Sequence, residues 1–583
     1  MLHTLTRSLR ENKGPALVTV LLSALEVVFE IVIPLFMSNL IDFGIEGCSM
    51  AAVWKFGAFL LLLAAFQLAT GVLAARIAAR ASVGFAANLR EDMYDNVQTF
   101  AFSNIDKFST ASIVTRLTTD TTNVQNAFQM LMRMAIRAPV MLIFSMIVSF
   151  RISRDISMTF LIILPILALA LFFIIRSVFP VFTRVFRTYD ELNNIVQENV
   201  RGIRVVKSFN QERHEIGKFG AISERIYKDF SKGERLITLN APLMQFCIYT
   251  CMIVISWLGA KAIIASGNDP ALGLTTGNLT ALITYTMQIL SSLMMLSMVF
   301  AMLTISLSSA RRIAEVLEER SDILQPEQPV MTVRDGAVDF DHVSFVYASK
   351  ADKKVLDDID LHIRSGETIG IIGGTGASKS SLVQLIPRLY DVTGGKLTLG
   401  GVDVRDYNLD TLRGAVAMVL QKNELFSGTI KENLRWGNEN ATDEELQHAC
   451  VLACADEFIS AMPDGYDTHI EQGGTNVSGG QKQRLCIARA LLKKPKVLIL
   501  DDSTSAVDTR TDAQIQQALS TYIPDTTKII IAQRISSVQN ADRIVVLDDG
   551  RIDAVGCHDE LLRTCEIYRE VYESQQKGGE DDA

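Results

Sequence analysis

Six long apolar segments in the first 310 residues limit the folds open to this chain more than any other feature. They span residues 16–41, 53–79, 126–150, 156–180, 237–265 and 279–307. A helix that crosses a bilayer needs about 20 mostly apolar residues, and the stretches 56–75, 156–175 and 236–260 contain no charge. The third segment is the least typical, because it contains Arg133 and Arg137. Six such segments are hard to bury in a soluble protein, so we predict six membrane-spanning helices.

The distribution of basic residues predicts how these helices are oriented. The stretches 76–125 and 176–235 are rich in Lys and Arg, whereas 42–52 and 266–278 contain neither. Basic residues favour the cytoplasmic side, so we predict a multi-pass protein of the cell (cytoplasmic) membrane with both chain ends in the cytoplasm. The two basic stretches are too long for simple loops. Their helical spacing predicts that the membrane helices continue beyond the bilayer as hairpins.

The pattern of the sequence changes after the last apolar segment. Residues 321–336 contain two prolines and no long apolar run, which indicates a linker. From 337 to 575, short β-rich runs alternate with helical ones, a pattern typical of an α/β domain with a mostly parallel sheet. We therefore predict a multi-domain membrane protein. An all-α six-helix transmembrane domain with long cytoplasmic extensions covers 1–320, an α/β phosphate-loop nucleotide-binding domain covers 337–575, and a polar tail covers 576–583.

A glycine-rich loop follows the predicted strand TIGIIG. The pattern G-x-x-x-x-G-K-[ST] holds phosphates with backbone N–H groups at a helix N-terminus. Gly373, Gly376, Lys379 and Ser380 fit this pattern, so Lys379 is expected to reach the β- and γ-phosphates and Ser380 to bind Mg²⁺. Ser378 stands where the pattern has a glycine.

Two later motifs strengthen this interpretation. The run VLILDD ends a predicted strand in Asp501 and Asp502, and an acid at that place suits Mg²⁺ coordination. Residues 476–495, NVSGGQKQRLCIARALLKKP, contain the run VSGGQ. That run resembles the signature of ATP-binding cassette (ABC) transporters. From about residue 16 to 575 the chain resembles exporter half-transporters, which fuse six membrane helices to one nucleotide-binding domain.

The resemblance implies ATP and Mg²⁺ as ligands and assigns residues to each. Around ATP it implies Tyr347, Gly373, Thr375, Gly376, Ala377, Ser378, Lys379, Ser380 and Ser381, with the Tyr347 ring stacked on adenine. Ser380, Gln421 and Asp501 would hold Mg²⁺. In this family two cassettes bind ATP head to tail, so the signature residues Ser478, Gly479, Gly480 and Gln481 would act on a partner's ATP.

Three positions depart from the pattern of an active cassette. Asp502 replaces the glutamate that polarises the attacking water, Gln533 replaces the switch histidine, and Ser378 replaces a glycine. Aspartate is one methylene shorter, and misplacing a catalytic group by about 1 Å can cost roughly a hundredfold in rate. Asp502, Gln533 and Gln421 form the expected hydrolytic machinery. Its defects, beside an intact signature, predict a heterodimer in which hydrolysis occurs mainly at the partner's site; the alternative is a slow homodimer.

Three polar residues in the membrane half are candidates for contact with a transported substrate. Glu26 and Glu30 lie one turn apart in the first apolar segment, and ionisable groups in a membrane are often functional. Gln288 lies in the methionine-rich sixth segment, where Met and Gln suit a pliable cavity wall. A cavity-facing carboxylate pair would favour cationic amphipathic substrates, although contacts with neighbouring helices are the plainer explanation.

We therefore predict ATP-driven export of small amphipathic, drug-like compounds across the lipid bilayer by one half of a pair, most like bacterial heterodimeric multidrug exporters. The partner would be a second half-transporter. Export of lipids or peptides, and a regulator or channel that transports nothing, remain alternatives. A net charge of −9 and a pI of about 5.5 give no support to nucleic acid as a partner.

Overall fold

The computed structural model describes the whole chain apart from residues 270–272, 348–353, 504–506 and 581–583. Within it the chain forms two compact units. The first, helical unit comprises Met1–Gln98 and Thr110–Glu319, and the second comprises Thr99–Ser109 and Arg320–Ala583. Each unit is described separately below.

The first unit is built from long helices. Its helices are α1 (Leu2–Arg7), α2 (Lys13–Asn39), α3 (Met50–Gln98), α5 (Thr110–Thr115), α6 (Thr121–Ile152), α7 (Arg154–Arg201), α8 (Ile203–Ser208), α9 (Glu212–Thr238), α10 (Asn240–Ser266) and α11 (Thr276–Glu318). A short 3₁₀ turn and two π-helical turns join some of them. Among the described residues, six helical segments are long and apolar enough to cross a membrane, which confirms the predicted number.

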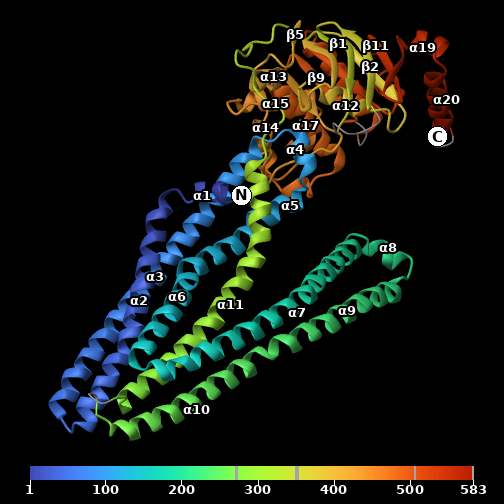
Figure 1. Ribbon diagram of the computed structural model, residues 1–583. Coiled ribbons are helices and arrows are strands. Elements are labelled where there is room, and N and C mark those ends of the chain that lie inside the picture. The colour runs from blue at the N-terminus through green and yellow to red at the C-terminus, as the bar shows by residue number, and fades with distance from the viewer. Residues whose placement is uncertain (270–272, 348–353, 504–506, 581–583) are drawn as a thin grey trace. The chain divides into compact units, whose positions relative to one another are not determined.

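Two helices extend well beyond their apolar segments. The α3 helix runs from Met50 to Gln98 and α7 from Arg154 to Arg201 without a break. Figure 1 shows α7 and α9 as a long hairpin closed by α8, and the two helices pack along each other. The predicted helical continuation of the membrane segments is therefore confirmed. No side chain described in the short α8 helix is buried within its unit.

The second unit is an α/β domain with two main sheets. The smaller sheet has the order β2 (Leu356–Ile363), β1 (Val338–Phe345), β4 (Gly394–Leu399), β5 (Val402–Asp403), and its neighbours are antiparallel. The larger sheet has the order β12 (Arg551–Gly556), β11 (Arg543–Asp548), β3 (Thr368–Gly373), β10 (Thr527–Ile531), β9 (Val497–Asp501), β6 (Val416–Val419). Five of its strands are parallel and only the edge strand β12 is antiparallel, so the predicted mostly parallel sheet is confirmed. A two-stranded ribbon joins β7 (Gly428–Thr429) to β8 (His469–Ile470).

Helices cover this sheet and build its two hydrophobic clusters. They are α12 (Lys379–Gln384), α13 (Leu409–Ala415), α14 (Ile430–Arg435), α15 (Asp443–Leu452), α16 (Asp456–Ser460), α17 (Gly479–Leu492), α18 (Thr509–Tyr522), α19 (His558–Thr564) and α20 (Glu566–Glu580). The short helix α4 (Phe102–Lys107), which interrupts the helical unit in the sequence, belongs to this unit. The strands β3, β9 and β10 are almost fully buried because both faces of the sheet are covered.

Candidate nucleotide site

The order of the strands brings the phosphate loop and the two acids together. The strands β3 and β9 both pair with β10, and Ile531 of β10 lies opposite Ile371 on one side and Asp501 on the other. Because these strands are parallel, the loop after β3 and the acids at the end of β9 lie at the same edge of the sheet. Ligands of open α/β sheets bind at such an edge.

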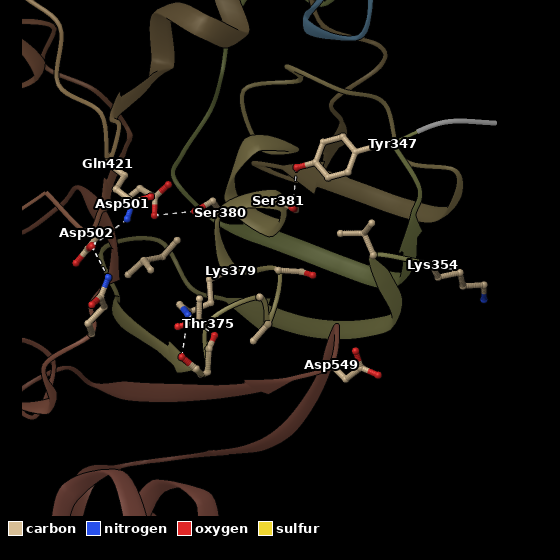
Figure 2. Close-up of a pocket in the computed structure, with 18 residues that line it drawn as sticks. Tyr347, Lys354, Thr375, Lys379, Ser380, Ser381, Gln421, Asp501, Asp502 and Asp549 are labelled. Carbon is tan, nitrogen blue, oxygen red and sulfur yellow. Dashed lines mark hydrogen bonds between the residues drawn. The ribbon is translucent and has the colours of Figure 1, made fainter. Parts of the chain in front are cut away.

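A cavity of about 730 Å³ lies at this edge (Figure 2). The residues predicted around ATP and Mg²⁺ all line it, namely Tyr347, Gly373, Thr375, Gly376, Ala377, Ser378, Lys379, Ser380, Ser381, Gln421, Asp501, Asp502 and Gln533. Their individual roles toward ATP stay predictions. Figure 2 shows Tyr347 on one side of the phosphate loop and Gln421, Asp501 and Asp502 on the other. The aromatic ring and the two acids therefore lie on opposite sides of the cavity lining.

Lys379 lies at the start of α12 and turns back over the phosphate loop. Its Nζ donates to the carbonyl oxygens of Gly373 (2.8 Å) and Gly374 (2.9 Å). Partial burial lowers its pKa, while Asp501 and Asp502 act in the opposite direction. The ammonium group thus lies beside the phosphate loop. The backbone N–H groups of such a loop are the groups that would bind the phosphates of a nucleotide.

Asp501 and Ser380 provide a candidate magnesium site. The Asp501 side chain is almost fully buried, and its Oδ1 accepts a hydrogen bond from Ser380 Oγ (3.1 Å). Burial raises the pKa of Asp501, and the hydrogen bond from Ser380 partly offsets this effect. A carboxylate, a hydroxyl and the nearby amide of Gln421 form an all-oxygen donor set, which fits Mg²⁺. When bound, the ion would neutralise phosphate charge beside Lys379.

Asp502 is held by two glutamines. Its Oδ2 accepts from Gln533 Nε2 (2.7 Å) and from Gln421 Nε2 (3.2 Å). Both donors engage the same oxygen, and the residue is 9 % exposed. An oxygen already bonded to two amides is a poor acceptor for the proton of an attacking water, because its lone pairs are occupied.

The backbone of Asp502 also explains why a short acid is tolerated there. Its φ is +48°, in the left-handed region that L residues other than Asn and Asp rarely adopt. The main chain fixes this conformation, because Asp502 N–H donates to the carbonyl oxygen of Ile531 (2.9 Å). The sequence showed that the acid is short but not that its backbone is unusual.

Ser378 adopts the same left-handed conformation, with φ +68°. We predict that Ser378→Gly stabilises the nucleotide-binding domain by about 0.5–1 kcal/mol, because relief of the left-handed strain outweighs the added freedom of the unfolded chain. Thermal unfolding of the full chain measures this effect. The matched control is Ser520→Gly near the end of α18, where the same change should destabilise. Equal destabilisation by both changes would contradict the strain argument.

Tyr347 stands at the opposite end of the cavity. Its hydroxyl lies 2.7 Å from Ser381 Oγ, and the residue is 44 % exposed, which leaves room for a base to stack on the ring. The ring contacts Tyr390 edge-on (5.1 Å between centroids). Tyr390 in turn donates to Asp106 of α4 (2.7 Å), and burial together with Asp106 raises the Tyr390 pKa.

Sequence reasoning missed part of the cavity lining. Lys354, Val355 and Asp549 also line it, with Gly374 and Ile531. Asp549 follows β11, whose Leu547 pairs with Gly373 at the start of the phosphate loop. That neighbour relation depends on strand order, which the sequence alone did not specify. Lys354 and Asp549 are labelled in Figure 2.

The signature residues form the start of a helix away from this cavity. Ser478 caps α17: its Oγ accepts from Gln481 N–H (3.3 Å), and Gln481 Oε1 accepts from Ser478 N–H (2.9 Å). Ser478 and Gly479 are exposed, so the N-terminus of this helix is accessible to solvent. Among the described residues that line the cavity, none belongs to the signature. This arrangement suits recognition of an anion on another molecule.

The predicted substrate residues in the helical unit are joined by an arginine. Arg137 on α6 donates from Nη1 to Glu26 Oε1 (2.9 Å) and from Nη2 to Glu30 Oε2 (2.7 Å), both on α2. Gln288 Nε2 on α11 donates to the carbonyl oxygen of Glu30 (3.2 Å), and its Oε1 accepts from Ser145 (3.2 Å). The charges in the first and third apolar segments therefore neutralise each other in part. A charge within a membrane segment needs a partner of opposite charge. The presence of acids in the first apolar segment and of arginines in the third could therefore have predicted this pairing.

Comparison with known proteins agrees with this fold and site. Residues 16–294 match the family described as ABC transporter transmembrane region, and residues 356–505 match the family described as ABC transporter. A fused helical membrane domain and phosphate-loop domain define an ATP-driven membrane transport protein. The chain is 36% identical over 561 residues to the uncharacterized ABC transporter ATP-binding protein YfiB of Bacillus subtilis, covering 96% of each chain. The chain therefore belongs to the ABC transporter family, as a fused half-transporter.

A second similar protein and a solved structure extend this comparison. An ATP-dependent lipid A-core flippase of Desulfotalea psychrophila is 31% identical over 489 residues, which cover 84% of each chain. The structure of a bacterial Atm1-family ABC exporter with ATP bound superposes with a TM-score of 0.80 at 23% identity. The superposition covers 97% of this chain and 98% of the exporter, so the two share the whole fold. The predicted family and fold class are confirmed.

Proposed function

We propose that this chain is one half of a heterodimeric exporter, in which its own pocket binds ATP with Mg²⁺ but hydrolyses it slowly. The observation that carries the proposal is the hydrogen bonding of Asp502. Its Oδ2 accepts hydrogen bonds from both Gln421 and Gln533. A general base must be free to take a proton from water and must be placed within hydrogen-bond reach of it. Here the acid is short, and one of its two carboxylate oxygens, Oδ2, already accepts two hydrogen bonds.

The signature supports the second half of the proposal. Ser478, Gly479 and Gln481 form a well-capped, exposed helix N-terminus with the family's residues. Such an end can contribute donors to the γ-phosphate in a partner's pocket. The chain would thus complete a competent site on the partner while holding ATP in its own. On this proposal both termini lie in the cytoplasm and the six helices span the cytoplasmic membrane.

The charged cluster in the helices bears on the substrate. Glu26, Glu30 and Arg137, when all ionised, sum to one net negative charge. The side chains of Glu30 and Arg137 are 24% and 26% exposed, so the cluster is partly accessible. A partly accessible, net negative group within apolar helices suits an amphipathic cation, such as a cationic drug. A lipid is the second candidate, favoured by the relative described as a lipid A-core flippase.

Transport by reconstituted protein tests this function. The chain would be placed in lipid vesicles together with a candidate partner half-transporter that has glutamate and histidine at the positions of Asp502 and Gln533. We expect ATP-dependent accumulation of a cationic amphipathic dye and little movement of a fluorescent anionic lipid. Lipid movement without dye uptake would assign the lipid function. Absence of ATP-dependent transport of either probe, in vesicles whose pair hydrolyses ATP, would contradict the exporter proposal.

A further inference from the structure

We infer that Gln575 on the C-terminal helix α20 is a positioning residue for the nucleotide pocket, because its side-chain amide fixes the backbone from which Gln533 reaches Asp502. The inference rests on ATP binding by this pocket and not on the unequal-pair proposal. Gln575 lies outside the cavity lining, at a point in the sequence where only a polar tail was expected to follow.

One planar amide holds two main-chain groups of the same segment. Gln575 Nε2 donates to the carbonyl oxygen of Gln533 (2.7 Å), and its Oε1 accepts from Ile535 N–H (2.9 Å). Ile535 begins a 3₁₀ turn that ends at Ser537. The first N–H groups of a helical turn have no partner within it, so an outside acceptor is needed. The side chain of Gln575 thus replaces the hydrogen bonds that the sheet and the turn do not supply at this junction.

The helix that carries Gln575 is firmly anchored. Tyr568 is fully buried, and its hydroxyl lies 2.7 Å from His558 Nδ1. Val571 and Tyr572 pack against the same hydrophobic cluster of the domain. Residues three, four and seven positions apart share one face of a helix, so Tyr568, these two residues and Gln575 form one stripe. The amide is therefore held from a rigid base.

The junction held by Gln575 leads directly to the acid-rich end of the cavity. Gln533 Nε2 donates to Asp502 Oδ2 (2.7 Å), and both residues line the cavity. Asp502 lies on the side of the phosphate loop away from Tyr347 (Figure 2). If the base of a nucleotide stacks on Tyr347, its terminal phosphate points to this end. The position of the Gln533 amide should therefore affect recognition of the third phosphate, and leave the rest of the nucleotide unaffected.

Binding of ATP and ADP to the full chain tests the inference. The probes are fluorescent analogues of the two nucleotides with Mg²⁺, titrated against chain in lipid nanodiscs. Loss of a hydrogen bond of this kind changes an equilibrium about three- to tenfold. We expect Gln575→Ala to lower the preference for ATP over ADP by that factor and to leave ADP affinity unchanged. A purely structural role would lower both affinities together, and that result would overturn the inference.

Two further variants make the test specific. Gln533→Ala should reduce the preference by a similar factor, and adding Gln575→Ala to it should have no further effect, because both act through one group. Gln576→Ala is the matched control: it alters the next residue of α20, whose Nε2 donates to Tyr572 of the same helix (2.9 Å), and should leave the preference unchanged. Additive effects of the first two changes, or an unaltered preference in Gln575→Ala, would overturn the inference. So would a wild-type chain that binds ATP no better than ADP.

Discussion

Combining Asp502→Glu with Gln533→His is expected to raise ATP hydrolysis at this chain's own pocket about tenfold to a hundredfold. The longer side chain moves the carboxylate by about 1 Å toward the water position, a displacement that can change a rate roughly a hundredfold. Removing Gln533 also removes the shorter of the two amide contacts to the acid (2.7 Å). The measurement is phosphate release under saturating MgATP by the full chain paired with a partner half whose own catalytic glutamate is replaced by glutamine.

Either substitution alone should give a smaller increase in the rate of ATP hydrolysis. In Asp502→Glu the amide of Gln533 still competes for the carboxylate. Glutamate at φ +48° also costs about 1 kcal/mol of backbone strain, which aspartate tolerates better. The matched control is Asp502→Asn with Gln533→His, which keeps the side-chain size and removes the base. A similar rise in this control, or no rise in the Glu and His pair, would contradict the geometric explanation.

Arg137→Ala is expected to destabilise the helical unit by about 3–5 kcal/mol, because it leaves two carboxylates unpaired within apolar helices. Glu26 and Glu30 lose their partner at 2.9 Å and 2.7 Å, and α2 loses its ionic contact with α6. Arg133→Ala, one turn earlier on α6, removes an equal charge outside the cluster and is the control. Thermal unfolding in nanodiscs, monitored by tryptophan fluorescence, measures the loss.

A compensating variant separates charge from packing in this cluster. Arg137→Met with Glu26→Gln and Glu30→Gln removes all three charges while keeping similar volumes. Replacement of a buried ion cluster by neutral groups is often nearly neutral in stability. We therefore expect most of the stability to return. A triple variant as unstable as Arg137→Ala would show that the charges are not the cause.

The sequence predicted the architecture well, because its signals are long and redundant. Six apolar segments give six spanning helices, and the alternating runs after residue 337 give a mostly parallel sheet. Most of the cavity lining was also predicted, because the phosphate loop and the two acids that end VLILDD each lie at the end of a strand of that sheet. Motifs that end buried parallel strands meet at one edge whatever the detailed packing.

What the sequence did not predict depends on backbone conformation and on contacts distant along the chain. The left-handed φ of Asp502 and Ser378 follows from how each loop is held, which residue identity does not reveal. In the sequence, Arg137 only makes the third apolar segment less typical, because its pairing with Glu26 and Glu30 depends on the packing of α6 on α2. The contact between Gln575 and the backbone at Gln533 joins a segment expected to be near the end of the domain to its pocket.

The nucleotide retained by this chain tests the central claim most directly. The chain would be purified in complex with a partner half whose own catalytic glutamate is replaced by glutamine, so that only this pocket could hydrolyse. After incubation with labelled MgATP and rapid removal of free nucleotide, the bound label would be identified chemically. We predict that most of it is still ATP after many minutes. Predominantly ADP, released with phosphate at a steady rate, would contradict a pocket that holds ATP and hydrolyses it slowly.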